Sequence, residues 1–188
     1  MAIERQTGDA ARGLLLRGGR VIDGTGAAAF LADVRVRDGR IDEVGLDLAA
    51  RGETTIDASG RVVAPGFIDV HTHDDQMVLG SPEMLPKVSQ GVTTVIVGNC
   101  GISLAPLVRG SVPPPLNLLG GSDKYRFATM REYARAVDEV RPAVNVAALV
   151  GHSTLRVASM GYPYRAATPA EQARMVDLAR EAMDAGAT

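Results

Sequence analysis

The sequence predicts an α/β protein in which a small antiparallel β unit precedes a parallel sheet that is covered by helices. Residues 13–64 carry short apolar stretches separated by glycine turns, which is typical of antiparallel strands. From Pro65 onward the apolar stretches are longer, rich in valine and separated by helical segments, which is typical of parallel strands buried on both faces. The composition, with 46% hydrophobic and 22% charged residues, is that of an ordinary globular protein.

The bulk properties of the chain disfavour several classes of partner. Its formal net charge is −2 and no basic stripe stands out, so we expect no nucleic-acid partner. No apolar run reaches the roughly 18 residues that cross a bilayer, so we expect no membrane span. Residues 1–12 are polar and charged, which predicts a flexible tail rather than a secretory signal, and therefore a cytoplasmic protein.

The first predicted unit, residues 13–64, consists of short strands and tight turns. The pair Gly18-Gly19 predicts a turn after the first apolar stretch. Residues 33–37 alternate charged and apolar side chains, which is the period of a half-buried strand. Asp38-Gly39 then predicts a hairpin that leads into residues 40–44. No set of residues in this unit suggests chemistry.

The second predicted unit, residues 65–188, alternates strands with helices. Thr168 fits the N-cap of its last helix, Pro169 fits the first helical position and Gly186 fits the stop. The stretch 101–122 is long and rich in proline, so we expect a loop near a functional site. The predicted strands cover residues 66–73, 91–100 and 143–153, and the predicted helices cover 129–140 and 169–185.

The sharpest local feature is the sequence PGFIDVHTH at residues 65–73. Side chains two apart on a strand point to the same face, so Asp69, His71 and His73 are predicted to share one face. Two imidazoles near the end of a strand can hold one metal ion, although they can also be hydrogen-bonded core histidines. Asp69 could orient an imidazole or satisfy backbone groups instead.

The only cysteine and all three histidines lie at the C-terminal ends of predicted strands, the edge at which α/β proteins build their sites. Cys100 is therefore a candidate metal ligand, with a buried inert cysteine as the alternative. His152 and Ser153 are candidates for contacting the substrate or for orienting a neighbouring side chain. His152 could also hydrogen-bond the backbone or bind the metal. Asp74 and Asp75 are expected to cap a helix start.

These residues resemble a known family. The stretch 65–73 resembles the first-strand signature of the amidohydrolase superfamily. Residues 89–95 (SQGVTTV), 98–106 (GNCGISLAP) and 149–156 (LVGHSTLR) resemble the D-aminoacylases, also called N-acyl-D-amino-acid deacylases. The resemblance covers the chain from about residue 13 to its end.

The resemblance implies a metal-dependent (β/α)₈ TIM barrel with a small β-sandwich built from both chain ends. It assigns His71 and His73 as ligands of one metal position and Cys100 as the thiolate ligand of the zinc site, and it leaves open whether one or two metals bind. Members hydrolyse the amide of a small-molecule N-acyl-D-amino acid to a carboxylate and a D-amino acid, with zinc activating water and an aspartate as general base. That aspartate is expected beyond the present residues.

A complete barrel needs about 250 residues, so the 188 residues are expected to form an incomplete TIM-like barrel with the first three strands. In this interpretation residues 65–188 are the N-terminal part of the barrel and residues 13–64 are part of the sandwich. We expect little turnover from this chain alone, and a second chain could complete the barrel. The alternatives are a cyclic-amide hydrolase of the hydantoinase or dihydroorotase kind, a non-catalytic remnant, or half of a split enzyme.

Overall fold

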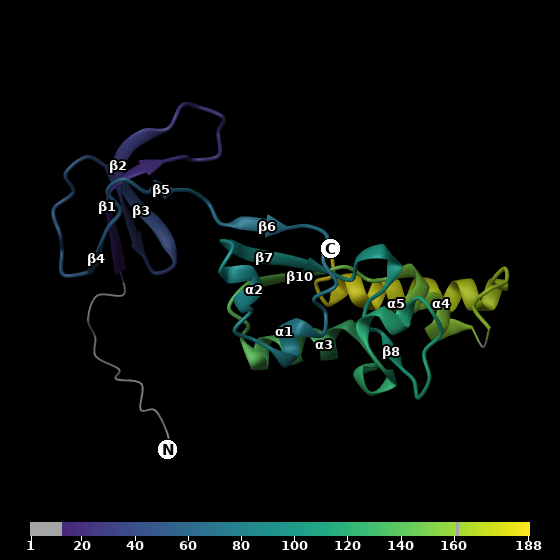
Figure 1. Cartoon of the computed structure of the whole chain (residues 1–188). Helices are drawn as coiled ribbons and strands as arrows, with labels where there is room; N and C mark the ends of the chain where they lie inside the picture. Colours follow the sequence, from purple (N-terminus) through teal and green to yellow (C-terminus); the bar gives the residue numbers. More distant parts are fainter. Residues whose placement is uncertain (1–12, 161) are drawn as a thin grey trace, which may run out of the picture. The chain divides into compact units, whose positions relative to one another are not determined.

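A computed structural model describes residues 13–160 and 162–188 (Figure 1). The predicted tail, residues 1–12, lies outside the described residues. The chain divides into two compact units, Met1–Pro65 and Gly66–Thr188, which we call unit 1 and unit 2.

Unit 1 is built on one five-stranded sheet with the order β3-β2-β1-β4, and β5 also pairs with β1. The Asp38-Gly39 hairpin joins β2 to β3 as predicted, and both of its residues have positive φ angles, 48° and 74°. The strands are β1 (Gly13–Val21), β2 (Phe30–Arg37), β3 (Arg40–Gly45), β4 (Thr54–Asp57) and β5 (Val62–Val63).

The turn predicted at Gly18-Gly19 is wrong, because β1 runs through both glycines. The register against β2 shifts between Leu16 and Gly19, so the glycines form an irregularity inside the strand. Gly18 has a φ of +69°, and its amide donates to Asp33 Oδ1 at 2.7 Å. A Cβ on Gly19 would lie 2.6 Å from Val63 Cγ2, so this position has no room for a side chain.

The prediction of a purely antiparallel unit is also wrong in part. β1 pairs with β2 in the antiparallel sense, and β2 does the same with β3. β4 and β5, however, both pair with β1 in the parallel sense. The chain leaves β3 and returns to the free edge of β1 through residues 46–53, a crossover that strand periodicity alone does not reveal.

Unit 2 contains a three-stranded parallel sheet with the order β10-β7-β6. These strands are shorter than predicted: β6 spans Phe67–Asp69, β7 spans Val92–Val97 and β10 spans Asn145–Ala148. The residues predicted at the strand ends therefore lie in the segments that follow the strands. A separate antiparallel pair joins β8 (Leu107–Val108) to β9 (Arg126–Phe127) within and after the proline-rich stretch.

The two longer helices of unit 2 begin where the sequence predicts. Thr129 caps α3, and its side chain accepts from Glu132 N. Thr168 and Glu171 form a capping box at the start of α5, with Pro169 at the first position. The eight-residue α4 was not predicted, and its first two residues, His152 and Ser153, were assigned to the end of a strand. The α-helices are α1 (Met77–Gly80), α2 (Leu85–Val88), α3 (Met130–Val140), α4 (His152–Ser159) and α5 (Pro169–Asp184).

The core of unit 2 lies between its sheet and its helices. Val95 and Val97 of β7 are 0% and 1% exposed, and Met130 and Tyr133 of α3 are 2% and 3% exposed. This packing fixes the central strand and so fixes the segment that follows it. No helix among the described residues is long and apolar enough to cross a membrane.

Candidate metal centre

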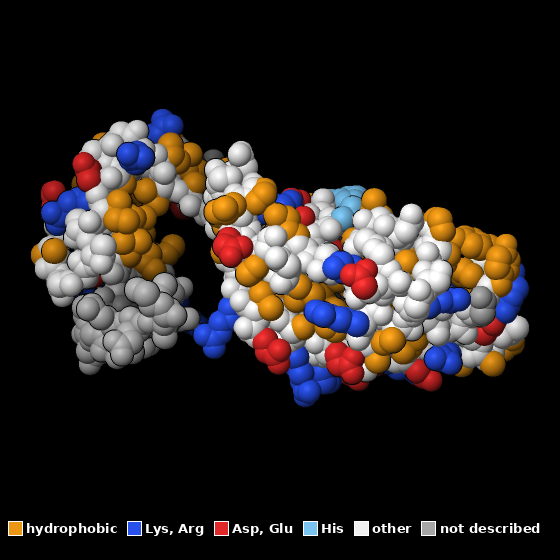
Figure 2. Space-filling model, turned by 60° about the horizontal axis from the view of Figure 1, so that its bottom comes forward, with side chains coloured by type: hydrophobic (Ala, Val, Ile, Leu, Met, Phe, Trp, Pro, Cys, Tyr) orange, Lys and Arg blue, Asp and Glu red, His pale blue; other side chains and the backbone are white. Residues whose placement is uncertain are grey.

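Three side chains from two loops of unit 2 come together as one donor group. His71 and His73 lie in the loop after β6, and Cys100 lies in a 3₁₀ turn, Asn99–Gly101, after β7. One donor atom from each lies within 4.8 Å of the others, and His71 Nε2 is 3.1 Å from Cys100 Sγ. Figure 2 shows histidine side chains reaching the surface of this unit. The strand alternation proposed for the histidines is wrong, because β6 ends at Asp69.

The turn that carries Cys100 has an unusual backbone. Gly98, Cys100 and Gly101 have φ angles of 83°, 56° and 75°, a left-handed region that only glycine enters freely. A Cβ on Gly98 would lie 2.2 Å from the carbonyl oxygen of Leu149. The two glycines therefore allow the chain to turn tightly against the segment after β10, and this turn brings the thiol to His71.

Asn99 ties the two donor loops together. Its Nδ2 donates to the carbonyl of Ile96 at 2.7 Å and to the carbonyl of Thr72 at 3.3 Å. Thr72 lies between the two histidines, and Asn99 directly precedes Cys100. The side-chain amide of Asn99 therefore links the histidine loop to the turn that carries Cys100.

His152 and Ser153 begin α4, whose first residues pack against the Cys100 turn. An ideal Cβ on Gly151 would lie 2.4 Å from the carbonyl oxygen of Gly101, so the two backbones are in close approach. The contact is held by Ser103, whose Oγ accepts from Gly151 N at 3.0 Å. His152 is exposed and does not belong to the donor group found among the described residues.

Two carboxylates beside the histidines are held by a lysine. Lys87 Nζ donates to Asp69 Oδ2 at 2.6 Å and lies 2.9 Å from Asp74 Oδ2. The hydrogen bond from Lys87 lowers the pKa of Asp69. Asp69 Oδ1 accepts from the backbone of His71 at 3.4 Å, so Asp69 satisfies backbone and ammonium groups, with no imidazole hydrogen bond among the described residues.

The prediction that Asp74 and Asp75 cap a helix is wrong. α1 begins at Met77, and its N-cap residue Gln76 makes no side-chain cap. Asp75 is 1% exposed and accepts from Gly98 N at 3.3 Å, which joins the histidine loop to the Cys100 turn. Burial is the main cause that raises the pKa of Asp75 to about 6. Tyr133 donates to the backbone carbonyl of Asp75 at 2.9 Å.

The donor group fits zinc. Two imidazoles and a thiol are ligands that zinc favours, whereas magnesium and calcium favour oxygen. Tetrahedral zinc with bonds of about 2.0–2.3 Å places its donors about 3.5 Å apart, which is compatible with a group confined to 4.8 Å. In addition, the buried Nδ1 of His73 has no hydrogen-bond partner among the described residues.

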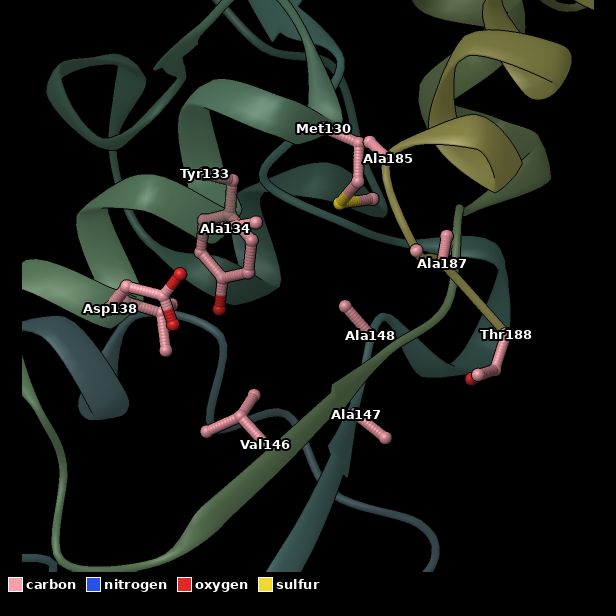
Figure 3. Close-up of a pocket in the computed structure, with 12 residues that line it drawn as sticks. Met130, Tyr133, Ala134, Asp138, Val146, Ala147, Ala148, Ala185, Ala187 and Thr188 are labelled. Atoms are coloured by element: carbon pink, nitrogen blue, oxygen red, sulfur yellow. The ribbon is translucent and has the colours of Figure 1, made fainter.

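A separate pocket of about 270 Å³ opens between α3, β10 and the segment after α5 (Figure 3). Met130, Tyr133 and Asp138 face it from α3, and Val146 and Ala148 line it from β10. No histidine or cysteine lines it, so the pocket is distinct from the donor group.

Sequence reasoning missed Lys87, and it noted Asn99 only as part of a motif. The available signal for Lys87 was its rarity, because Lys87 and Lys124 are the only lysines of the chain. A half-buried lysine in a short apolar helix is expected to have a charged partner.

Comparison with known proteins identifies the family. The sequence profile of the amidohydrolase family matches residues 54–188 of this chain. The chain belongs to this family. Within the family, it is 55% identical over 173 residues to an N-acyl-D-aspartate deacylase of Alcaligenes xylosoxydans xylosoxydans, covering 92% of this chain and 35% of that protein.

Solved structures give the same result. The chain is similar to a D-aminoacylase with a TM-score of 0.89 and 52% identity, covering 93% of this chain and 37% of that one. It is also similar to an N-acyl-D-glutamate deacylase of Bordetella bronchiseptica, solved with zinc and a phosphonate mimic of the tetrahedral intermediate, with a TM-score of 0.87 and 50% identity. That match covers 93% of this chain and 36% of that one. The resemblance to D-aminoacylases is thus confirmed, and the chain spans about a third of the length of these amidohydrolases.

Proposed function

We propose that this chain supplies zinc ligands of an N-acyl-D-amino-acid deacylase, namely those that come earliest in its sequence. Such an enzyme is a hydrolase of carbon–nitrogen bonds other than peptide bonds. The observation that carries the proposal is the convergence of His71, His73 and Cys100 within 4.8 Å. The similarity to proteins named as deacylases at 50–55% identity supports the substrate class, a small-molecule N-acyl-D-amino acid.

In this proposal each residue has a chemical task. The imidazoles of His71 and His73 and the thiolate of Cys100 would hold zinc. Bound zinc would supply Lewis-acid chemistry, which polarises an acyl carbonyl and makes water more acidic. Asn99 and Asp75 hold the two donor loops in register through Thr72 and Gly98. The general base is expected in a part of the relatives with which this chain does not align.

The remaining site candidates lie around this centre. Asp69 positions the histidine loop through the amide of His71. We assign His152 and Ser153 to the substrate side of the site, because α4 begins against Gly101, next to Cys100. Their task would be to contact the acyl group or to orient a neighbouring side chain.

We infer further that β6, β7 and β10 are the first three strands of a (β/α)₈ barrel. The parallel pairing of these strands supports this, as does the hydrogen bond from Thr188 N to the carbonyl of Ala148, a residue of the edge strand β10. Residues 65–188 would then be the N-terminal part of the barrel and residues 13–64 part of a β-sandwich. A second polypeptide segment would supply the other strands.

The metal part of the proposal is tested on this chain by equilibrium dialysis and elemental analysis. We expect about one zinc per wild-type chain and a strong loss of zinc in Cys100→Ala, since the variant lacks one of three donors. Cobalt substitution adds a spectroscopic measure, because a thiolate ligand produces a charge-transfer band that Cys100→Ala must lack. Equal zinc content in both proteins would contradict the proposed ligand set.

The substrate part is tested on the complete barrel, that is, on this chain together with the polypeptide segment that would supply the other strands. Release of carboxylate is followed from N-acetyl-D-methionine, N-acetyl-D-aspartate and their L enantiomers. We expect turnover of D substrates that Cys100→Ala abolishes together with the bound zinc. Zinc binding without any D-selective hydrolysis would contradict the deacylase function, but it would still support the proposed metal site.

A further inference from the structure

The carboxylates that flank the histidine pair are excluded from the donor group. Asp69 lies two residues before His71, and Asp74 follows His73 directly. Carboxylates next to a pair of imidazoles are frequent metal ligands. Yet the donor group among the described residues contains His71, His73 and Cys100 and neither aspartate.

The structure shows what occupies both carboxylates. Lys87 extends from α2 and places its ammonium group 2.6 Å from Asp69 Oδ2 and 2.9 Å from Asp74 Oδ2. The same Nζ donates to Thr72 Oγ1 at 3.3 Å, and Thr72 is 6% exposed and lies between the two histidines. The side chain of Lys87 is 19% exposed and that of Asp74 is 14% exposed, so solvent weakens these contacts only in part.

The composition of a donor group decides which metal it prefers. Imidazole and thiolate favour zinc and cobalt, whereas carboxylate oxygen favours harder ions such as manganese. A carboxylate released beside two imidazoles would add an oxygen donor to the group, and oxygen donors raise the affinity for harder divalent ions such as manganese relative to a group that contains a thiolate. A residue that restrains the two aspartates would therefore affect which metal the site prefers.

We propose that Lys87 is a positioning residue that keeps the site selective for zinc over harder divalent ions by holding Asp69 and Asp74 away from the donors. This inference rests on the proposed metal site, and it adds a residue that acts on metal choice without touching the metal. Lys87 acts through its charge and its two ion pairs, so arginine is expected to replace it in part and methionine is not.

The experiment measures the zinc and manganese affinities of the whole chain by competition with a chromophoric chelator. Removal of one positive charge strengthens the binding of every divalent ion to a similar extent. The ratio of the zinc affinity to the manganese affinity therefore reports only a change in the donor atoms. In Lys87→Met we expect the zinc-to-manganese ratio to fall by about tenfold or more, the scale on which outer residues tune a metal site. Lys87→Arg is expected to lie nearer to wild type.

Two further variants separate this effect from damage to the fold. Lys124→Met removes the other lysine of unit 2, which pairs only with the exposed Asp123 in the described structure, and should leave the ratio unchanged. Combining Lys87→Met with Asp69→Asn and Asp74→Asn removes the released carboxylates and should restore the wild-type ratio. Tyrosine circular dichroism, which reports on unit 2 alone, verifies that each variant is folded.

The outcomes distinguish the two proposals. A folded Lys87→Met variant with the wild-type ratio would overturn the role of Lys87, and so would a triple variant whose ratio stays lowered. A wild-type chain that binds no zinc would instead overturn the proposed metal site, and the selectivity role with it. Wild-type zinc binding with a ratio that falls and is then restored supports both.

Discussion

The two units of the chain use buried polar groups in opposite ways. In unit 1, Arg35 is 1% exposed and pairs with Glu53 at 2.8 Å, and it also contacts Glu43 and the carbonyl of Ala49. Asp33 is 4% exposed and accepts from two backbone amides. In unit 2, the polar groups at the ends of β6 and β7 leave donor atoms facing one another, and Nδ1 of His73 is buried without a partner.

This difference separates structural polar groups from functional ones. Buried charges that satisfy one another stabilise a single conformation and have no capacity left for a ligand. Among the described residues, the buried side-chain atoms without a hydrogen-bond partner belong to His73, Asp74 and Ser159, all in unit 2, and Asp74 is paired with Lys87. The unpartnered Nδ1 of His73, just beyond the carboxyl end of β6, therefore marks the site better than burial or charge alone.

The largest expected effect comes from breaking the polar cluster of unit 1. Arg35→Met leaves Glu53 buried without its cation, so we expect unit 1 to unfold while unit 2 remains folded. Hydrogen exchange should show loss of protection within residues 13–65. All four tyrosines lie in unit 2, so near-UV circular dichroism should stay unchanged. The control is Arg37→Met, an exposed position on the same strand; equal protection in both variants would contradict the structural role of Arg35.

A smaller effect is expected from the Cys100 turn. In Gly98→Ala the new methyl group meets the carbonyl of Leu149 at 2.2 Å, and the left-handed backbone adds strain, so the turn must shift. We expect zinc affinity to fall by about tenfold or more, because the thiol moves relative to His71. Gly110→Ala is the matched control, since a Cβ there meets nothing within 4 Å. Unaltered zinc affinity in Gly98→Ala would show that the turn does not position the thiol.

The smallest effect concerns the pH dependence of unit 1. The hydrogen bond from Arg35 is the main cause that lowers the pKa of Glu53 from 4.5 to about 2. A lowered folded-state pKa gives a stabilisation that is fully present above about pH 4.5 and is lost as the pH falls toward about 2. Urea unfolding of wild type and Glu53→Gln should differ most above pH 5 and converge as the pH approaches about 2. A difference that does not change with pH would refute this linkage.

The sequence predicted those features of the fold that depend on neighbouring residues. The N-cap Thr168, the helix over residues 129–140 and the Asp38-Gly39 turn are local features, so their positions follow from a few side chains. The parallel pairing of β4 with β1 is decided by contacts far apart in sequence, and no local pattern revealed it. The end of β6 at Asp69 was missed because the side chains go on alternating beyond it, with Val70 and Thr72 between the polar residues.

The candidate site divides along the same line. The grouping of His71, His73 and Cys100 follows from the rule that parallel strands end at one edge, even though all three lie beyond their strands. Lys87 could not be found in this way, because its role exists only once α2 lies beside the histidine loop. The expected caps Asp74 and Asp75 failed because Lys87 and Gly98 compete for their carboxylates.

Cys100 is both the only thiol of the chain and an exposed side chain of the donor group. A thiol-directed dye can therefore attach at one position only, and an ion held by the sulfur would shield it. The fraction of labelled chains then equals the fraction of metal sites that are empty. A single mass spectrum can therefore measure the metal occupancy of the site without any substrate.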